Sequence, residues 1–262
     1  MDLGIKSKQA LVLASSRGLG HGVAIALARE GANVLLCGRS ADDLAQNCAQ
    51  INSEGEGHAD WFQADLSEER FVSVAAGAVA QGGKPIDILV NNTGGPTSGS
   101  AEAMTAEQLQ LFFMSMVVRV IDLTNRLLPD MKKKGWGRVL TLASSGVIEP
   151  INSLALSNTL RPALVGWSKT LATEVADQGI TSNVLLPGAI LTARINQLNE
   201  AAAKRTGKPV EDVRANSEKQ IPVGRYGRVD EFASVAAFLC SNQASYITGS
   251  IVRCDGGATR SI

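Results

Sequence analysis

The chain has 262 residues, 45% of them hydrophobic and 19% charged, which provides enough apolar material for a sizeable core and excludes a disordered polypeptide. Its 25 Lys and Arg residues equal its 25 Asp and Glu residues, and no basic run is longer than residues 132–134, so the composition argues against nucleic-acid binding. No apolar stretch reaches the roughly 18 residues that a membrane span needs, so we expect no membrane segment.

The N-terminus and the cysteines bear on where the protein works. The first residues, Met-Asp-Leu-Gly-Ile-Lys, lack the basic start and apolar centre of a signal peptide. Cys37, Cys48, Cys240 and Cys254 form no CxxC pair and have no histidine at metal-ligand spacing. These features predict a reduced, cytoplasmic protein without a metal site.

Short apolar runs alternate with amphipathic segments along the chain. The runs typical of buried strands are residues 10–14, 33–37, 86–91, 138–143, 181–186 and 250–254. The helical patterns between them are residues 20–30, 41–53, 68–81, 105–134, 161–178 and 229–241. Strands that are apolar on both faces belong to parallel sheets covered by helices on both sides. The pattern therefore predicts an α/β fold, a doubly wound parallel sheet of the Rossmann type, as a single domain over residues 1–262.

One segment interrupts this alternation. Residues 191–226 are polar and helix-prone in patches, and they follow the strand at residues 181–186. Doubly wound sheets bind ligands at the carboxyl ends of their strands. We therefore interpret this insertion as a lid over a substrate pocket; the alternative is a solvated excursion without a role.

The first predicted strand leads directly into a glycine-rich turn and a helix. The turn contains Ser16, Arg17, Gly18, Leu19 and Gly20. Such a turn presents backbone N–H groups and the positive end of a helix dipole to a pyrophosphate. Glycine permits the close backbone approach that a side chain would block.

This turn, at residues 13–20, is the first of five segments with familiar motifs. The others are Asp65-Leu66, Asn91-Asn92-Thr93-Gly94, Pro187-Gly188-Ala189-Ile190-Leu191-Thr192 and the tail at residues 246–257. In this order they resemble the TGxxxGxG, adenine-contacting, NNAG, PGxxxT and closing-strand motifs of the short-chain dehydrogenase/reductase superfamily, and in particular its 3-oxoacyl-[acyl-carrier-protein] reductase-like branch. Leu13, Ala14 and Thr93 depart from the motifs. The resemblance covers nearly the whole chain and implies a sheet of about seven strands.

The resemblance implies a bound nicotinamide dinucleotide. The residues that would hold it are Ser16, Arg17, Gly18, Leu19, Gly20, Arg39, Asp65, Leu66, Asn92, Gly94, Arg161, Pro187, Gly188, Ile190 and Thr192. Members that prefer NAD carry an acid after the second strand, where this chain has Gly38 followed by Arg39. Arg39 and Arg17 together favour the 2′-phosphate of NADP(H), unless both are simply solvated surface arginines.

The resemblance also locates the family's catalytic tetrad of tyrosine, lysine, serine and, in many members, asparagine. Residues 163–172 resemble the stretch after the lysine, which places Arg161 at the lysine position and Ser157 at the tyrosine position. The serine position is Ser144, and Met116 occupies the asparagine position. The catalytic candidates are therefore Ser144, Ser157 and Arg161, in an atypical site.

These replacements change the available proton chemistry. An aliphatic hydroxyl is not a practical acid at cellular pH, and arginine stays protonated. If the helix begins at Pro162, Ser157 and Arg161 lie in a turn rather than on one helical face. Of the two tyrosines, Tyr246 is expected to be structural, whereas Tyr226 could reach the pocket from the end of the insertion.

Three functions remain open. The first is an NADP(H)-dependent oxidoreductase that acts, with an altered proton donor, on a carbonyl or alcohol of a β-ketoacyl-like or similar small molecule. The second is a non-catalytic NADP(H)-binding relative that serves as a regulatory or sensor subunit. The third is a different reaction in the same pocket. We also expect a homotetramer or homodimer, because the helix at residues 105–134 has a wide apolar stripe and the family pairs this helix between subunits. The stripe consists of Leu109, Phe112, Phe113, Met116, Val120 and Leu123.

Overall fold

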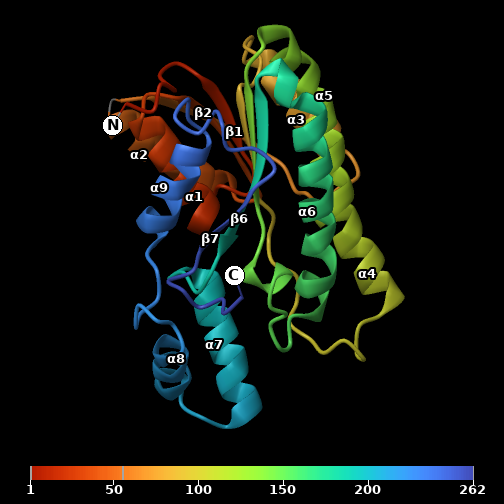
Figure 1. Cartoon of the computed structure of the whole chain (residues 1–262), viewed down its shortest axis with the longest axis vertical. Coiled ribbons are helices and arrows are strands. Elements are labelled where there is room, and N and C mark those ends of the chain that lie inside the picture. Colours follow the sequence, from red (N-terminus) through yellow and green to blue (C-terminus); the bar gives the residue numbers. More distant parts are fainter. Residues whose placement is uncertain (1, 55, 262) are drawn as a thin grey trace.

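A seven-stranded parallel sheet lies at the centre of the computed structural model, which describes residues 2–54 and 56–261 (Figure 1). Its strand order is β3-β2-β1-β4-β5-β6-β7, and each strand pairs in parallel with its neighbours. The strands are β1 (Gln9–Val12), β2 (Asn33–Gly38), β3 (His58–Gln63), β4 (Ile88–Asn91), β5 (Gly137–Leu142), β6 (Ile180–Pro187) and β7 (Ile251–Cys254). The order reverses between β1 and β4, which creates the crevice where doubly wound sheets bind ligands.

Helices cover both faces of the sheet, as the sequence predicts. On the left of Figure 1 lie α1 (Gly18–Arg29), α2 (Ala41–Glu54) and α9 (Val229–Leu239). On the right lie α3 (Phe71–Gln81), α5 (Arg119–Lys134) and α6 (Ala155–Val175). Each face has its own apolar cluster, one around Val12 and Phe232 and the other around Leu11 and Phe71. The doubly wound α/β fold expected from the sequence is confirmed.

The edge strand β3 is absent from the six apolar runs. Of its six residues, only Ala59 is buried. An edge strand has one neighbour and needs fewer apolar side chains, so its sequence lacks the signal of a central strand.

The long helix expected at residues 105–134 consists of three consecutive segments. They are α4 (Ala106–Phe113), a π-helical turn at Met114–Val118, and α5. Met116 lies in the π turn and is buried, as are Val120 and Leu123. That half of the predicted subunit-facing stripe therefore packs inside the chain. In the other half of the stripe Phe113 is exposed, and so are the adjacent Leu111 and Met114.

Helix α6 corrects the expectation that a helix begins at Pro162. The helix begins at Ala155 and continues through the proline to Val175. Proline removes one backbone hydrogen bond, yet the helix persists because Leu156, Leu160 and Leu164 are buried in one apolar cluster. Ser157 and Arg161 therefore lie one turn apart on a single helix and not in a turn.

The insertion at residues 191–226 forms two helices, α7 (Ala193–Thr206) and α8 (Val210–Lys219), below the sheet in Figure 1. Its two ends meet in a short parallel bridge between Ile190 and Gly227. The amide of Leu191 donates to the carbonyl of Gly227, and the amide of Gly227 donates to the carbonyl of Ala189, each at 2.9 Å. None of the helices in the described part of the chain combines the length and apolar character that crossing a bilayer requires.

Candidate functional site

A cavity of about 1130 Å³ opens at the carboxyl ends of the strands, between the sheet and α7. Its lining includes all the candidate residues from the sequence except one. These are Ser16, Arg17, Gly18, Leu19, Arg39, Asp65, Leu66, Asn92, Gly94, Ser144, Ser157, Arg161, Pro187, Gly188, Ile190 and Thr192. The exception, Gly20, is buried in the first turn of α1. The structure thus brings residues from six strand ends to one place.

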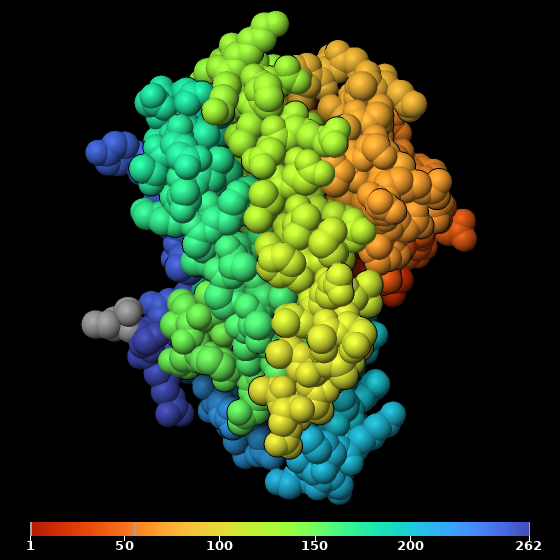
Figure 2. All heavy atoms as spheres, turned by 90° about the vertical axis from the view of Figure 1, so that its right-hand side faces the viewer, coloured from red at the N-terminus to blue at the C-terminus, as the bar shows by residue number. Residues whose placement is uncertain are grey.

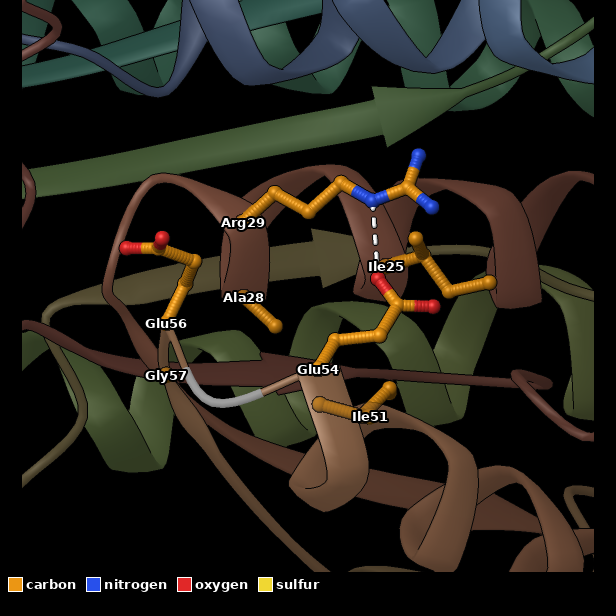
Figure 3. Close-up of a pocket in the computed structure, with 7 residues that line it drawn as sticks. All are labelled: Ile25, Ala28, Arg29, Ile51, Glu54, Glu56 and Gly57. Carbon is orange, nitrogen blue, oxygen red and sulfur yellow. Dashed lines mark hydrogen bonds and ion pairs between the residues drawn. The ribbon is translucent and has the colours of Figure 1, made fainter.

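A second, much smaller pocket lies at the opposite end of the sheet, where the chain enters β2 and β3 (Figure 3). Its volume is about 10 Å³. It is spanned by an ion pair of 2.9 Å between Arg29, the last residue of α1, and Glu54, the last residue of α2. Arg29 and Glu54 neutralise each other, and the space holds at most a water molecule.

The turn before α1 has the features of a phosphate cradle. Gly18 has a φ of +62°, which favours glycine. At Gly20, a Cβ atom would lie 2.5 Å from the carbonyl oxygen of Ala14 and 2.7 Å from the amide nitrogen of Asn92. The side chain of Arg17, at the N-cap, makes no capping hydrogen bond. The amide groups of the first turn are therefore left for another acceptor, and a phosphate suits them.

The adjacent wall is suited to a 2′-phosphate. At Gly38, the last residue of β2, a Cβ atom would lie 3.1 Å from that of Ser16, so an acidic side chain has little room there. Arg39 follows and is exposed on the cavity lining. Arg17 is also exposed and forms only a 3.6 Å ion pair with Asp43. Such exposed pairs are weak, so Arg17 can exchange this partner for a phosphate.

Neighbouring contacts hold the rest of this wall in place. The Nη1 group of Arg119 donates a 2.7 Å hydrogen bond to the carbonyl of Leu66, and Asn92 donates one of 3.2 Å to the carbonyl of Ala14. At Gly188, a Cβ atom would lie 2.6 Å from the Cα atom of Asp255, so only glycine fits. Among the described residues, the buried Thr93 hydroxyl has no hydrogen-bond partner, although Thr93 lines the cavity. An unpartnered hydroxyl in this wall fits a polar ligand.

The three catalytic candidates lie at the far end of the same cavity. Ser144 follows β5, is half-buried, and accepts a 3.2 Å hydrogen bond from the amide of Gly146. Ser157 and Arg161 are each 7% exposed. The Nη1 group of Arg161 donates a 3.0 Å hydrogen bond to the carbonyl of Leu142. Burial first, and the nearby charge of Arg194 second, lower the pKa of the Arg161 guanidinium to about 10.

Neither of the two tyrosines lines the cavity. The hydroxyl of Tyr226 donates a 3.2 Å hydrogen bond to the buried Asn199 within the insertion, and Tyr226 does not line the cavity. Tyr246 projects fully into solvent. Met116 lines the cavity and offers a thioether where a hydrogen-bonding amide was expected.

Arg194 lines the same cavity and was not singled out from the sequence. It lies in the first turn of α7, lines the cavity, and donates a 2.7 Å hydrogen bond to the carbonyl of Pro96. Its place two residues after Thr192 was the available signal, because Thr192 ends a recognised motif and caps α7. Within the described parts of the chain, no cluster of three or more potential metal ligands is found.

Comparison with known proteins places the chain among reductases and dehydrogenases. The profile of the family described as "Enoyl-(Acyl carrier protein) reductase" matches residues 13–259. D-beta-hydroxybutyrate dehydrogenase of Cupriavidus necator is 32% identical over 256 residues, covering 97% of this chain and 98% of that protein. The 3-oxoacyl-[acyl-carrier-protein] reductase FabG of Salmonella typhimurium is 31% identical over 258 residues, covering 97% and 98%.

A solved structure with the same fold contains both a cofactor and a substrate. The crystal structure of L-sorbose reductase from Gluconobacter frateurii, complexed with NADPH and L-sorbose, superimposes with a TM-score of 0.94. The two chains are 29% identical, and the alignment covers both completely. The likeness thus includes the insertion as well as the sheet.

Proposed function

The chain belongs to the short-chain dehydrogenase/reductase superfamily, and on that premise we propose that it is an NADP(H)-dependent oxidoreductase with an altered proton donor. The substrate class is a small carbonyl compound or the corresponding alcohol, such as a β-ketoacyl compound. The observation that carries the proposal is the shared cavity: the turn before α1 and the Ser157–Arg161 pair line one continuous space.

NADP(H) fits the part of the cavity nearest β1 and β2. The amides of Gly18 and Leu19 would hold its pyrophosphate, and Arg17 and Arg39, which also line the cavity, would neutralise its 2′-phosphate. Asp65 and Leu66 line the adenine end, while the segment from Pro187 to Thr192 lines the nicotinamide end. The cofactor supplies the hydride. A similar protein supports this assignment, since L-sorbose reductase was solved with NADPH.

The residues at the far end would position the substrate and handle the proton. The hydroxyls of Ser144 and Ser157 can hold the substrate oxygen and a water molecule. This water would pass a proton to the alkoxide formed by hydride transfer and take one back from bulk solvent, so that no hydroxide is left in the site. Arg161 stays protonated at neutral pH, because its pKa of about 10 lies well above that range. Its positive charge stabilises negative charge that develops on the substrate oxygen.

Steady-state NADPH oxidation with a panel of β-keto thioesters tests this proposal, with a tyrosine-bearing relative as control. We expect measurable turnover that is slower than in the control. Fluorescence of NADPH on mixing with the protein measures binding separately. Binding without turnover of any carbonyl substrate would favour a non-catalytic NADP(H)-binding subunit, and no binding would contradict both functions.

We further propose that the protein acts in the cytoplasm as a homodimer or homotetramer. The exposed side chains of Leu111, Phe113 and Met114 support assembly through α4 and the adjoining π turn. Figure 2 shows this face, with α4 and α5 in yellow and light green beside the darker green α6. Clustered apolar side chains on one face are typical of subunit contacts.

A further inference from the structure

Two arginines share the substrate end of the cavity without an acidic partner. Arg161 projects from α6 and Arg194 from α7, and both line the same space. No carboxylate lies within 4.0 Å of either guanidinium among the residues that the structure describes. The charge of Arg194 nevertheless acts on Arg161, since it contributes to the lowered pKa of that residue. The two cations therefore repel each other in the protein without a ligand.

The position of each arginine increases the cost of this arrangement. Arg161 is more than nine-tenths buried, and a buried charge without a counter-ion is strongly unfavourable. Arg194 lies in the first turn of α7, where the positive end of the helix dipole disfavours a cation. Both residues remain charged at neutral pH. A ligand with negative charge would relieve both penalties at once.

The other charged residues around the cavity also favour a negatively charged ligand. Its arginines are Arg17, Arg39, Arg161, Arg194, Arg205 and Arg260, whereas its only acidic lining residues in the described chain are Asp65 and Glu149. The Oε1 atom of Glu149 accepts hydrogen bonds from the amides of Arg260 and Ser261. Among the described residues, Glu149 forms no ion pair with Arg161 or Arg194.

We propose that the substrate of this chain carries a carboxylate, which binds between the guanidinium groups of Arg161 and Arg194 beside the reacting carbonyl. This inference rests on the proposed function and specifies its substrate class. The phosphates of NADP(H) have their own donors in the free amides of the turn before α1 and in Arg17 and Arg39, which also line the cavity. One Nη group of each arginine is already bonded to a carbonyl, of Leu142 or of Pro96. The remaining donors match the two oxygens of a carboxylate better than the three of a phosphate.

Ligand-observed NMR titrations of the full chain, with and without NADP⁺, test the inference. Acetoacetate and its methyl ester share a ketone and differ in the carboxylate charge. Dihydroxyacetone phosphate and dihydroxyacetone form the corresponding phosphate pair. We expect acetoacetate to bind at least about tenfold more tightly than its ester, as charge-assisted hydrogen bonds imply. Dihydroxyacetone phosphate should exceed dihydroxyacetone in affinity by a smaller factor.

Three variants locate the effect. Arg194→Met should abolish the preference for acid over ester, whereas Arg205→Met, which removes an exposed arginine from the same lining, should keep it. Arg161→Lys preserves the charge but not the planar donor group, and should reduce the preference in part.

Absence of any preference in the parent protein, or equal loss in both methionine variants, would overturn the inference. A greater gain from the phosphate would overturn the choice of carboxylate. The NADP⁺-free titration keeps this result separate from the proposed function, which fails only if the cofactor does not bind or no carbonyl compound turns over.

Discussion

Arg161 and Leu142 connect helix α6 to the end of strand β5 through a 3.0 Å hydrogen bond from guanidinium to backbone carbonyl. The bond fixes the side chain that the motif resemblance aligns with the family's lysine. It also directs one nitrogen away from the cavity, so that fewer donors remain for the cofactor or the substrate. The helical register places Ser157 one turn before it, on the same buried side of α6.

This register predicts that the family's proton donor can be restored. Ser157→Tyr with Arg161→Lys should raise turnover of a β-keto thioester by about 10²–10⁴, the usual contribution of a positioned general acid. Ser157→Tyr alone should do little, because the guanidinium of Arg161 is held by the carbonyl of Leu142 and does not take the place of the lysine ammonium beside the phenol. Adding Pro162→Ala should change nothing further, since α6 is already helical on both sides of the proline. Steady-state NADPH oxidation measures each variant.

The matched control for that experiment is Thr159→Tyr, which adds the same side chain to an exposed position of α6. It should leave turnover unchanged. A parent enzyme as fast as tyrosine-bearing relatives, and indifferent to Ser157→Ala, would show that the proton comes from another group.

The charges beside Gly38 predict the cofactor preference. The parent should bind NADPH more tightly than NADH, and Arg39→Asp should weaken NADPH by about 10- to 100-fold, the value of a lost charge-assisted contact, while sparing NADH. Lys84→Asp makes the same charge change at an exposed site and should spare both. Fluorescence titration gives the affinities of all three proteins for both cofactors. Equal affinities of the parent for the two cofactors would refute the assignment of the 2′-phosphate site.

The close packing at Gly20 predicts a local intolerance of side chains. Gly20→Ala should weaken NADPH binding about tenfold or more, because its Cβ would approach the carbonyl of Ala14 to 2.5 Å and displace the turn. Gly77→Ala is the control: it lies in α3 with no atom within 4 Å, and should raise the free energy of unfolding by ~0.5–1 kcal/mol. Denaturant unfolding and NADPH titration separate the two effects. Unaltered binding in Gly20→Ala would count against the phosphate cradle.

The apolar side chains at the α4 end predict the assembly. Light scattering should find a dimer or tetramer at micromolar concentration, and Phe113→Glu should shift it towards smaller species, because a charge in an apolar contact is costly. Val223→Glu introduces the same charge at an exposed valine near the end of the insertion and should leave the mass unchanged. A monomeric parent would contradict the proposal.

The central strands and the helices between them could be predicted because their side chains are buried on both faces, which leaves continuous apolar runs in the sequence. The same reasoning missed β3, where only Ala59 is buried. It also failed at Pro162, because a local rule about proline cannot register that Leu160 and Leu164 are anchored in an apolar cluster. Tertiary packing decided both cases.

The candidate site likewise has one part that the sequence predicts and one part that it does not. Residues in the turn before α1 follow a motif because backbone geometry there restricts the choice of residue, as the crowding at Gly20 illustrates. The proximity of Arg194 to Arg161 depends instead on how α7 packs over the strand ends. Nothing in the local sequence of the insertion encodes that packing.

The bridge between Ile190 and Gly227 has a consequence for the history and engineering of the fold. It closes the insertion at its base, so the same two backbone hydrogen bonds can join its ends whatever residues the insertion contains. Because loop-closure entropy changes only slowly with length, α7 and α8 can be lengthened, shortened or exchanged at little cost to the rest of the molecule. Substrate range can thus diverge by transplanting one segment, Arg194 included, while the dinucleotide cradle is inherited unaltered.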